Sequence, residues 1–80
     1  MITVYVLRSL GSGKRYVGIT ENLARRLTEH RRPTSTVGKL LGPFEVFQTE
    51  EFGDYVGARA REKFLKSGQG RKELDRKFPA

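Results

Sequence analysis

The chain is 80 residues long, carries a formal net charge of +7, and contains one histidine and no cysteine. This is the length of one small domain, so we expect a single domain over residues 1–80. The composition excludes disulfides, thiolate zinc sites and metal sites built from several histidines. The excess of basic side chains favours a polyanionic partner, of which nucleic acid is the leading candidate.

No apolar run approaches the roughly 20 residues that a membrane span requires, and the first residues lack the apolar region of a signal peptide. We therefore expect a cytoplasmic protein with no membrane partner. The basic residues are scattered along the sequence instead of gathered in a tail. Nothing in this pattern indicates a linker or a second domain.

Two runs rich in β-branched and aromatic side chains, residues 2–8 and 15–20, flank a turn of glycine and serine. This pattern predicts an antiparallel hairpin. A turn centred between the runs places Tyr5 opposite Gly18, with Tyr16 two positions along the same strand as Gly18. Both phenols then share one face of the sheet, whereas a slip of one residue would separate them.

A basic helix is predicted from about residue 22 to residue 32, since Asn22 can cap its start and a proline follows its end. His30 falls on the apolar stripe of this helix, and Arg26 flanks that stripe. Arg25 points to the opposite side at 100° per residue. Of the two adjacent arginines, only Arg26 is therefore expected to face the sheet.

The rest of the chain predicts a loop over residues 33–43, a third strand over 44–52, and two helices over 54–66 and 71–77. The loop prediction follows from the threonine, serine and glycine content of its segment. The strand is bounded by Pro43 and by a glycine. The predicted order is ββαβαα, an α+β fold.

Glu62 is the most informative acid of the sequence, because it falls between Ala58 and Leu65 on an apolar stripe of its helix. Burying a carboxylate without a cation or donors costs on the order of several kcal/mol, so Glu62 is neutralised there or binds something. The alternative is a structural ion pair with a nearby arginine, or plain exposure. That alternative arises because Val56 and Phe64 belong to a second apolar face that could be the core instead.

Taken together, the chain resembles GIY-YIG nuclease domains, particularly the small stand-alone bacterial members. The resemblance lies in four segments in order: 4–9, 15–20, 22–27 with His30, and 60–66. The first tyrosine stands in Val-Tyr-Val instead of Gly-Ile-Tyr, so it is matched by its position on the strand. Some relatives carry a lysine where this chain has Ile19, and several use an asparagine after the glutamate, whereas Asn22 is the only asparagine here.

The resemblance implies a compact domain with a three-stranded antiparallel sheet and flanking helices, which hydrolyses DNA with Mg²⁺ or Mn²⁺. It implies that Glu62 is the metal ligand and that Tyr5 takes the proton of the attacking water. Tyr16 would position that water, and Arg26 would balance the charge of the phosphate. His30 would assist Tyr5 or orient the phosphate.

Such residue types suit phosphodiester hydrolysis, in which negative charge gathers on oxygens that a divalent cation and a guanidinium can stabilise. The resemblance and the charge imply an endonuclease acting in the repair or processing of DNA structures, on DNA or on RNA or branched forms. A homodimer or a partner protein is compatible with the small size. The alternative from another class is a non-catalytic nucleic-acid-binding module with the same fold. The expected phosphate contacts are Arg25, Arg31, Arg32, Lys39, Arg71 and Lys72.

Overall fold

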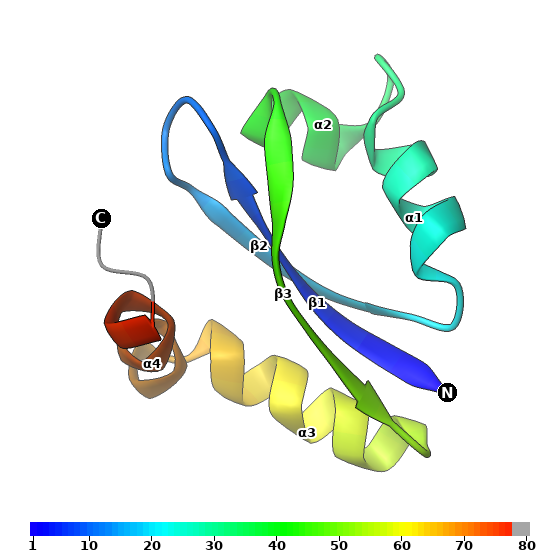
Figure 1. Ribbon diagram of the computed structural model, residues 1–80, viewed down its shortest axis with the longest axis vertical. Helices are drawn as coiled ribbons and strands as arrows, with labels where there is room; N and C mark the ends of the chain where they lie inside the picture. Colours follow the sequence, from blue (N-terminus) through cyan, green and yellow to red (C-terminus); the bar gives the residue numbers. More distant parts are fainter. Residues whose placement is uncertain (78–80) are drawn as a thin grey trace.

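The computed structural model describes residues 1–77 and has an α+β fold with a three-stranded sheet between two layers of helices (Figure 1). None of the helices in this described range is long and apolar enough to cross a membrane. In chain order the elements are β1 (Ile2–Ser9), β2 (Arg15–Thr20), α1 (Leu23–His30), α2 (Thr36–Leu41), β3 (Phe44–Phe52), α3 (Tyr55–Lys66) and α4 (Gly68–Lys77).

The sheet is antiparallel with the strand order β2-β1-β3, so β1 is the central strand. In the β1–β2 hairpin Tyr5 pairs with Gly18 and Leu7 pairs with Tyr16. The predicted register is therefore confirmed, and both tyrosines belong to the same face of the sheet. Because β2 lies at the edge, its residues next to Tyr5 have no further strand beside them.

The predicted bounds of β3 are confirmed, but its side chains do not alternate regularly between the two faces of the sheet beyond Val46. The register between β1 and β3 shifts at Val6 and Leu7, which pair with Gln48 and Val46 respectively. Phe47 is thus the extra residue of a β-bulge, and the residues after it change faces. A bulge depends on how two strands pair, so the sequence of one strand alone does not predict it.

The two faces of the sheet carry separate apolar clusters. On one face Val4 and Val6 pack with Ala58 and Leu65 of α3 and with Leu74 of α4. The opposite face carries Tyr5 and is covered by α1 and α2, as Figure 1 shows. Because β1 is buried on both faces, it reads as a nearly continuous apolar run.

The predicted loop over residues 33–43 is wrong, because it contains α2. Ser35 caps this short helix by accepting a hydrogen bond from the Gly38 amide at 3.1 Å, and Gly42 ends it with φ 63°. Leu41 is 3% exposed and packs beside Tyr5. Burial of the leucine against the sheet outweighs the weak local helix preference of this segment, so tertiary packing decides its structure.

Two predicted helix boundaries differ by two or three residues from those observed, whereas α3 begins one residue later than predicted and ends where predicted. α1 ends at His30, two residues before its predicted end, although Asn22 is its N-cap as expected. α4 begins at Gly68, three residues earlier than predicted, because Ser67 alone separates it from α3. The Ser67 hydroxyl accepts a hydrogen bond from the Gly70 amide at 3.2 Å and so satisfies one free donor of the new helix.

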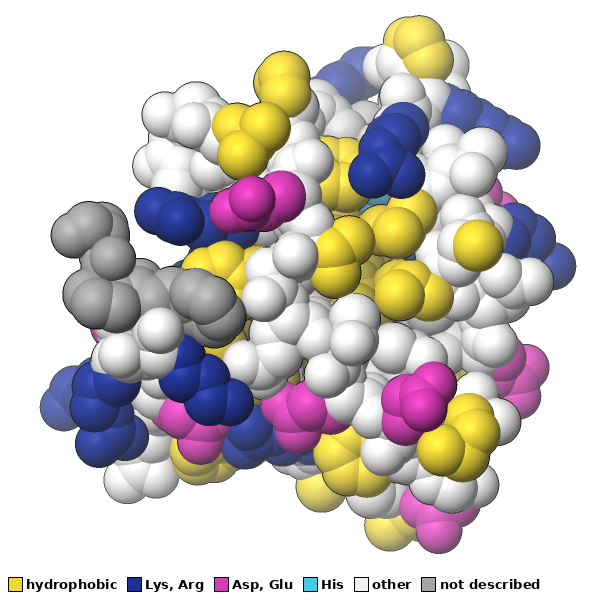
Figure 2. Space-filling view, viewed as in Figure 1, with side chains coloured by type: hydrophobic (Ala, Val, Ile, Leu, Met, Phe, Trp, Pro, Cys, Tyr) yellow, Lys and Arg dark blue, Asp and Glu magenta, His cyan; other side chains and the backbone are white. Residues whose placement is uncertain are grey.

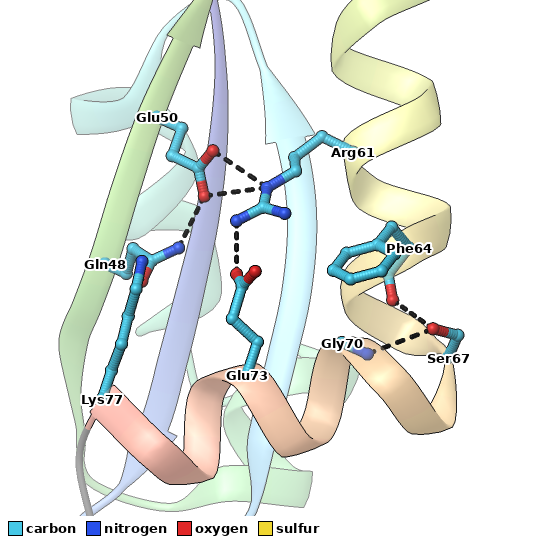
Figure 3. A network of polar contacts seen from close by, with 8 residues as sticks. All are labelled: Gln48, Glu50, Arg61, Phe64, Ser67, Gly70, Glu73 and Lys77. Atoms are coloured by element: carbon cyan, nitrogen blue, oxygen red, sulfur yellow. Dashed lines mark hydrogen bonds and ion pairs between the residues drawn. The ribbon is translucent and has the colours of Figure 1, made fainter.

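A polar network joins β3, α3 and α4 (Figure 3). Arg61 Nε donates to the two carboxylate oxygens of Glu50 at 2.9 and 3.1 Å, and Arg61 Nη2 lies 2.5 Å from Glu73 Oε2. Glu50 also accepts from Gln48 Nε2 at 2.6 Å. Lys77 Nζ extends the network to Gln48 Oε1 at 3.2 Å. The network therefore fixes α4 relative to the sheet.

Candidate active site

Tyr5, Tyr16 and His30 meet on the face of the sheet that α1 and α2 cover. Tyr5 Oη lies 2.8 Å from His30 Nε2, and the ring centroids of Tyr5 and Tyr16 are 6.3 Å apart. The ring of His30 meets that of Tyr16 edge-on at 5.5 Å. Tyr5 and His30 are 1% and 5% exposed, so both residues of this hydrogen bond are almost fully buried.

Gly18 makes room for the Tyr5 ring. A Cβ atom at Gly18 would lie 2.5 Å from Tyr5 Oη and 2.6 Å from Tyr5 Cζ, closer than carbon and oxygen can approach. The glycine of β2 therefore lets the phenol of Tyr5 lie flat across the neighbouring strand. The tyrosine and the glycine form one unit of the site.

A second close approach sets the position of His30. At Gly38 of α2 a Cβ atom would lie 2.4 Å from the backbone oxygen of His30. The missing side chain lets α2 pack directly against the end of α1. The unexpected helix α2 therefore helps to place the histidine over Tyr5.

Burial shifts the pKa values of the bonded pair in opposite directions. Desolvation, followed by the field of Tyr16, raises the pKa of Tyr5 to about 12. Desolvation, followed by the charge of Arg26, lowers the pKa of His30 below its ordinary value. Both side chains are therefore neutral at pH 7, and His30 is available to accept a proton.

Arg26 lies on α1 one turn before His30, and its charge acts on both members of the pair. It lowers the pKa of Tyr5 and that of His30. Arg26 Nε forms an ion pair with Glu29 Oε1 at 3.3 Å, and the Arg26 side chain is 41% exposed. The guanidinium is thus held by Glu29 on α1 and remains accessible to an anion.

Glu62 lies on α3, and its charge raises the pKa of Tyr5. The apolar stripe that contains Ala58 is the buried face of α3, whereas Val56 on the alternative face is 82% exposed. The side chain of Glu62 is 15% exposed and pairs with Lys66 Nζ at 3.0 Å. The expected cation partner is therefore a lysine of the same helix and not an arginine.

The oxygen-only donor set of the site fits a hard divalent cation held mainly by water and phosphate. Glu62 is the one carboxylate that the resemblance assigns to a metal, and residues 1–77 contain no group of three acidic, histidine or cysteine side chains that could hold an ion. Magnesium commonly binds proteins through one or two carboxylates together with substrate phosphates. Glu62 fits such an ion in the presence of a phosphodiester and not as a closed protein site.

The predicted phosphate contacts fall into separate groups. A cavity of about 400 Å³ is lined by His30 together with Arg31, Arg32 and Lys39, and the Arg31 guanidinium lies 5.0 Å from the centroid of Phe44. In Figure 2 little of the single histidine is visible, beside basic and hydrophobic side chains. These three cations therefore flank the site at the junction of α1 and α2.

The remaining predicted contacts lie elsewhere. Arg71 of α4 lines a groove of about 470 Å³ that also contains Tyr16. Lys72 faces a different depression, beside Phe64 and Gln69, and Arg25 is exposed on α1. The structure thus places Arg71 next to the site but does not bring Lys72 and Arg25 to it.

Three basic residues of the same groove, Lys14, Arg15 and Lys66, were not among the phosphate contacts predicted from the sequence. The spacing of Lys66 four residues after Glu62 was a signal for the ion pair. Lys14 gave no comparable signal, since only the fold brings the hairpin turn next to α3 and α4.

The comparisons with known proteins agree with this geometry. Residues 1–75 match the family model described as the GIY-YIG catalytic domain. No match of significance was found among curated proteins or among solved structures. The matched region includes β1, β2, α1 and α3, the four elements that supply Tyr5, Tyr16, Arg26, His30 and Glu62. The chain therefore belongs to the GIY-YIG family and has the nuclease-type fold of that family.

Proposed function

We propose that this protein is a divalent-metal-dependent endonuclease that hydrolyses phosphodiester bonds of DNA in the repair or processing of DNA structures. The observation that carries the proposal is the buried Tyr5–His30 hydrogen bond of 2.8 Å, with Arg26 and Glu62 close enough to change the pKa of that tyrosine. A binding surface needs exposed cations, but it has no use for a buried phenol–imidazole pair. A phenol and an imidazole joined by a hydrogen bond can pass a proton from one to the other.

Tyr5 and His30 together can accept the proton of an attacking water. With a pKa of about 12, Tyr5 alone is a poor base at neutral pH. The proton of the water passes to Tyr5 Oη while the phenolic proton passes to His30 Nε2. The lowered pKa of His30 keeps the imidazole neutral and able to receive it. This relay requires the tautomer of His30 in which Nδ1 carries the hydrogen.

Arg26, Tyr16 and Glu62 complete the proposed chemistry. The Arg26 guanidinium is 41% exposed and can bond the nonbridging oxygens of a phosphate, where charge develops. Tyr16 lines the groove beside the buried pair, and its ring contacts that of Tyr5, so it can position a water. Glu62 would hold Mg²⁺ or Mn²⁺, which supplies Lewis-acid stabilisation of the phosphate when bound.

The nucleic acid would cross the site between two basic depressions. One contains Arg31, Arg32 and Lys39, and the other contains Lys14 and Arg71. Both open beside residues of the candidate site, His30 and Tyr16 respectively. Contacts to the phosphate backbone from two sides would hold one strand without reading its bases, so we expect little sequence preference.

The second candidate function is a non-catalytic nucleic-acid-binding module. It is favoured by the raised pKa of Tyr5 and by the engagement of Glu62 with Lys66. Ile19 in place of the lysine of other family branches also favours it. The two functions make different predictions, since a binding module loses affinity with salt but never cuts.

The test compares nicking of plasmid, single-stranded and branched DNA by the parent, Glu62→Gln and Tyr5→Phe, with Mg²⁺, Mn²⁺ or a chelator. We expect the parent to cut only with metal, and each variant to be slower by roughly a hundredfold or more. Glu51→Gln is the matched control, because Glu51 is exposed on β3. Its rate should equal that of the parent.

Equal cutting by Glu62→Gln and the parent would remove Glu62 from the mechanism. No cutting by the parent on any of the three DNA forms, combined with salt-sensitive binding, would establish the binding module instead. Circular dichroism of each variant confirms that a lost activity is not a lost fold.

A further inference from the structure

We propose that Lys66 is an exchangeable counterion of Glu62, which couples nucleic-acid binding to divalent-metal binding at the candidate site. In the free protein the ammonium neutralises the carboxylate, and on binding of a strand it transfers to a phosphate and leaves Glu62 open to the metal. This inference rests on the proposed function and adds a control on when the metal is bound.

The ion pair has two unequal partners. Lys66 Nζ lies 3.0 Å from Glu62 Oε2, and the side chain of Glu62 is 15% exposed while that of Lys66 is 54% exposed. The carboxylate is thus fixed on the buried face of α3, whereas the ammonium reaches it from the solvent side on a flexible stem. Such a lysine can leave the pair by rotating its own side chain, without movement of the helix.

Lys66 also lines a second feature, the groove of about 470 Å³ between β2, α3 and α4. The groove brings Lys66 together with the cations of Lys14 and Arg71 and with the ring of Tyr16. Arg15 also lines the groove and forms an ion pair with Asp75 at 2.8 Å. Four cations and one aromatic ring in an open groove suit a single nucleic-acid strand, through phosphate contacts and stacking. The ammonium of Lys66 can therefore pair either with Glu62 or with a phosphate of a strand bound in the groove.

The exchange has a thermodynamic consequence. Without nucleic acid, a divalent cation has to displace Lys66 from the one carboxylate assigned to it, and residues 1–77 offer it no three-residue acidic or histidine cluster. With a strand in the groove, a phosphate replaces Glu62 as the partner of the ammonium. The cation then binds Glu62 without the free-energy cost of breaking the Glu62–Lys66 ion pair. Metal and nucleic acid should therefore strengthen each other's binding by equal factors.

Binding measurements test this without reference to cutting. Mn²⁺ affinity is measured by the loss of the free-ion electron paramagnetic resonance signal in the parent, Lys66→Met and Lys63→Met. Lys63 is exposed on the same helix and forms none of the ion pairs found among residues 1–77, so its variant removes an equal charge. We expect Lys66→Met to bind Mn²⁺ roughly two- to fivefold more tightly than Lys63→Met does.

Coupling is measured in the Tyr5→Phe background, which keeps the DNA intact. The affinity for a labelled single-stranded oligonucleotide is followed by fluorescence anisotropy with and without Mn²⁺. Mn²⁺ should strengthen binding in the presence of Lys66, and Lys66→Met should reduce this gain by the factor found for the free protein. Lys63→Met should leave the gain unchanged.

Indistinguishable Mn²⁺ affinities of Lys66→Met and Lys63→Met would overturn the inference and leave the proposed nuclease standing. An unchanged Mn²⁺ gain in oligonucleotide binding after Lys66→Met would do the same. Equal Mn²⁺ affinity of Glu62→Gln and the parent is a different outcome, since it would remove the metal ligand on which the proposed function depends.

Discussion

The phenol of Tyr5 lies across the backbone of Gly18, its partner on the neighbouring strand, at a distance that leaves no space for a methyl group. The relationship explains why a glycine stands in the middle of β2, where it weakens the strand. A small residue there lets a large ring lie against the sheet and reach His30 at 2.8 Å. The position of Tyr5, the proposed base, thus depends on the absence of a side chain at Gly18.

Gly18→Ala should therefore displace Tyr5. The added Cβ would meet two atoms of the ring at 2.5 and 2.6 Å, so the ring must move away from His30. Overpacking of this kind costs about 1–3 kcal/mol, and each kcal/mol lowers the melting temperature of a domain this size by roughly 4–8 °C. Gly11→Ala is the control, since nothing lies within 4 Å of its added Cβ. A Gly18→Ala protein with the parent's melting temperature and cutting rate would contradict this account.

The ionisation of Tyr5 can be observed directly. Burial raises its pKa from 10.0 to about 12, so in an alkaline absorbance titration at 295 nm its ionisation should be centred near pH 12. Tyr5→Phe should remove that step. Because the folded state holds this proton more tightly than the unfolded state, the associated stability is present below pH 10 and is lost as the pH rises through 12. A Tyr5→Phe titration that keeps the late step would assign it to another tyrosine.

Lowering the pH should also weaken the Tyr5–His30 pair, because His30 then becomes protonated. The pKa of His30 is lowered by burial and by Arg26 and raised by Glu29, and the neutral phenols of Tyr5 and Tyr16 complete its surroundings. The unfolded chain binds the proton first, so stability is full above about pH 6.5 and falls as the pH drops from there to the folded pKa.

Urea unfolding at pH 7.5 and pH 5 checks this sign. The free energy of unfolding of the parent should be lower at pH 5, and His30→Gln should lose much of that difference because glutamine does not titrate. The cutting rate of the parent should fall over the same pH range, since a protonated His30 cannot receive the proton of Tyr5. Equal pH dependence in parent and variant would place the titrating group elsewhere.

How far the sequence predicts this fold depends on whether a feature is local. The pairing of Tyr5 with Gly18 follows from alternation and a short turn, and the apolar stripe around Glu62 follows from helical periodicity. Both are properties of neighbouring residues. The bulge at Phe47 depends on how β3 meets β1, and no pattern within β3 predicts it.

The candidate site divides in the same way. Strand and helix positions predict which residues could meet, and the fold brings the rings of Tyr5, Tyr16 and His30 together. The partner of Glu62 could not be decided, because several cations lie within one turn of it on α3. In the structure Glu62 forms its ion pair with Lys66, whereas Arg61 forms ion pairs with Glu50 and Glu73.

Helix α2, which the sequence did not predict, offers a matched pair of leucines. Leu41 is 3% exposed and packs against the Tyr5 cluster, whereas its neighbour Leu40 is 53% exposed. Leu41→Ala should lower the free energy of unfolding by about 2–5 kcal/mol, because it leaves a cavity under the helix. Leu40→Ala should cost well under half of that. Equal losses in urea unfolding would mean that α2 is not anchored through Leu41.

The network of Arg61 predicts a structural and not a catalytic defect. The hydrogen bonds to Glu50 and, to a smaller extent, to Glu73 raise the pKa of Arg61. The hydrogen bond to Arg61 in turn lowers the pKa of Glu73. Arg61→Met would leave the two carboxylates near each other without their common cation, so the attachment of α4 to β3 should loosen (Figure 3).

In the Arg61→Met variant, hydrogen exchange should accelerate in α4 and the melting temperature should fall. Arg59→Met removes an exposed charge from the same helix and should change neither quantity. Cutting per folded molecule should stay near that of the parent at low temperature, because the hydrogen bonds of the network include neither Tyr5 nor His30. A large loss of cutting with α4 still protected would instead connect Arg61 to the active site.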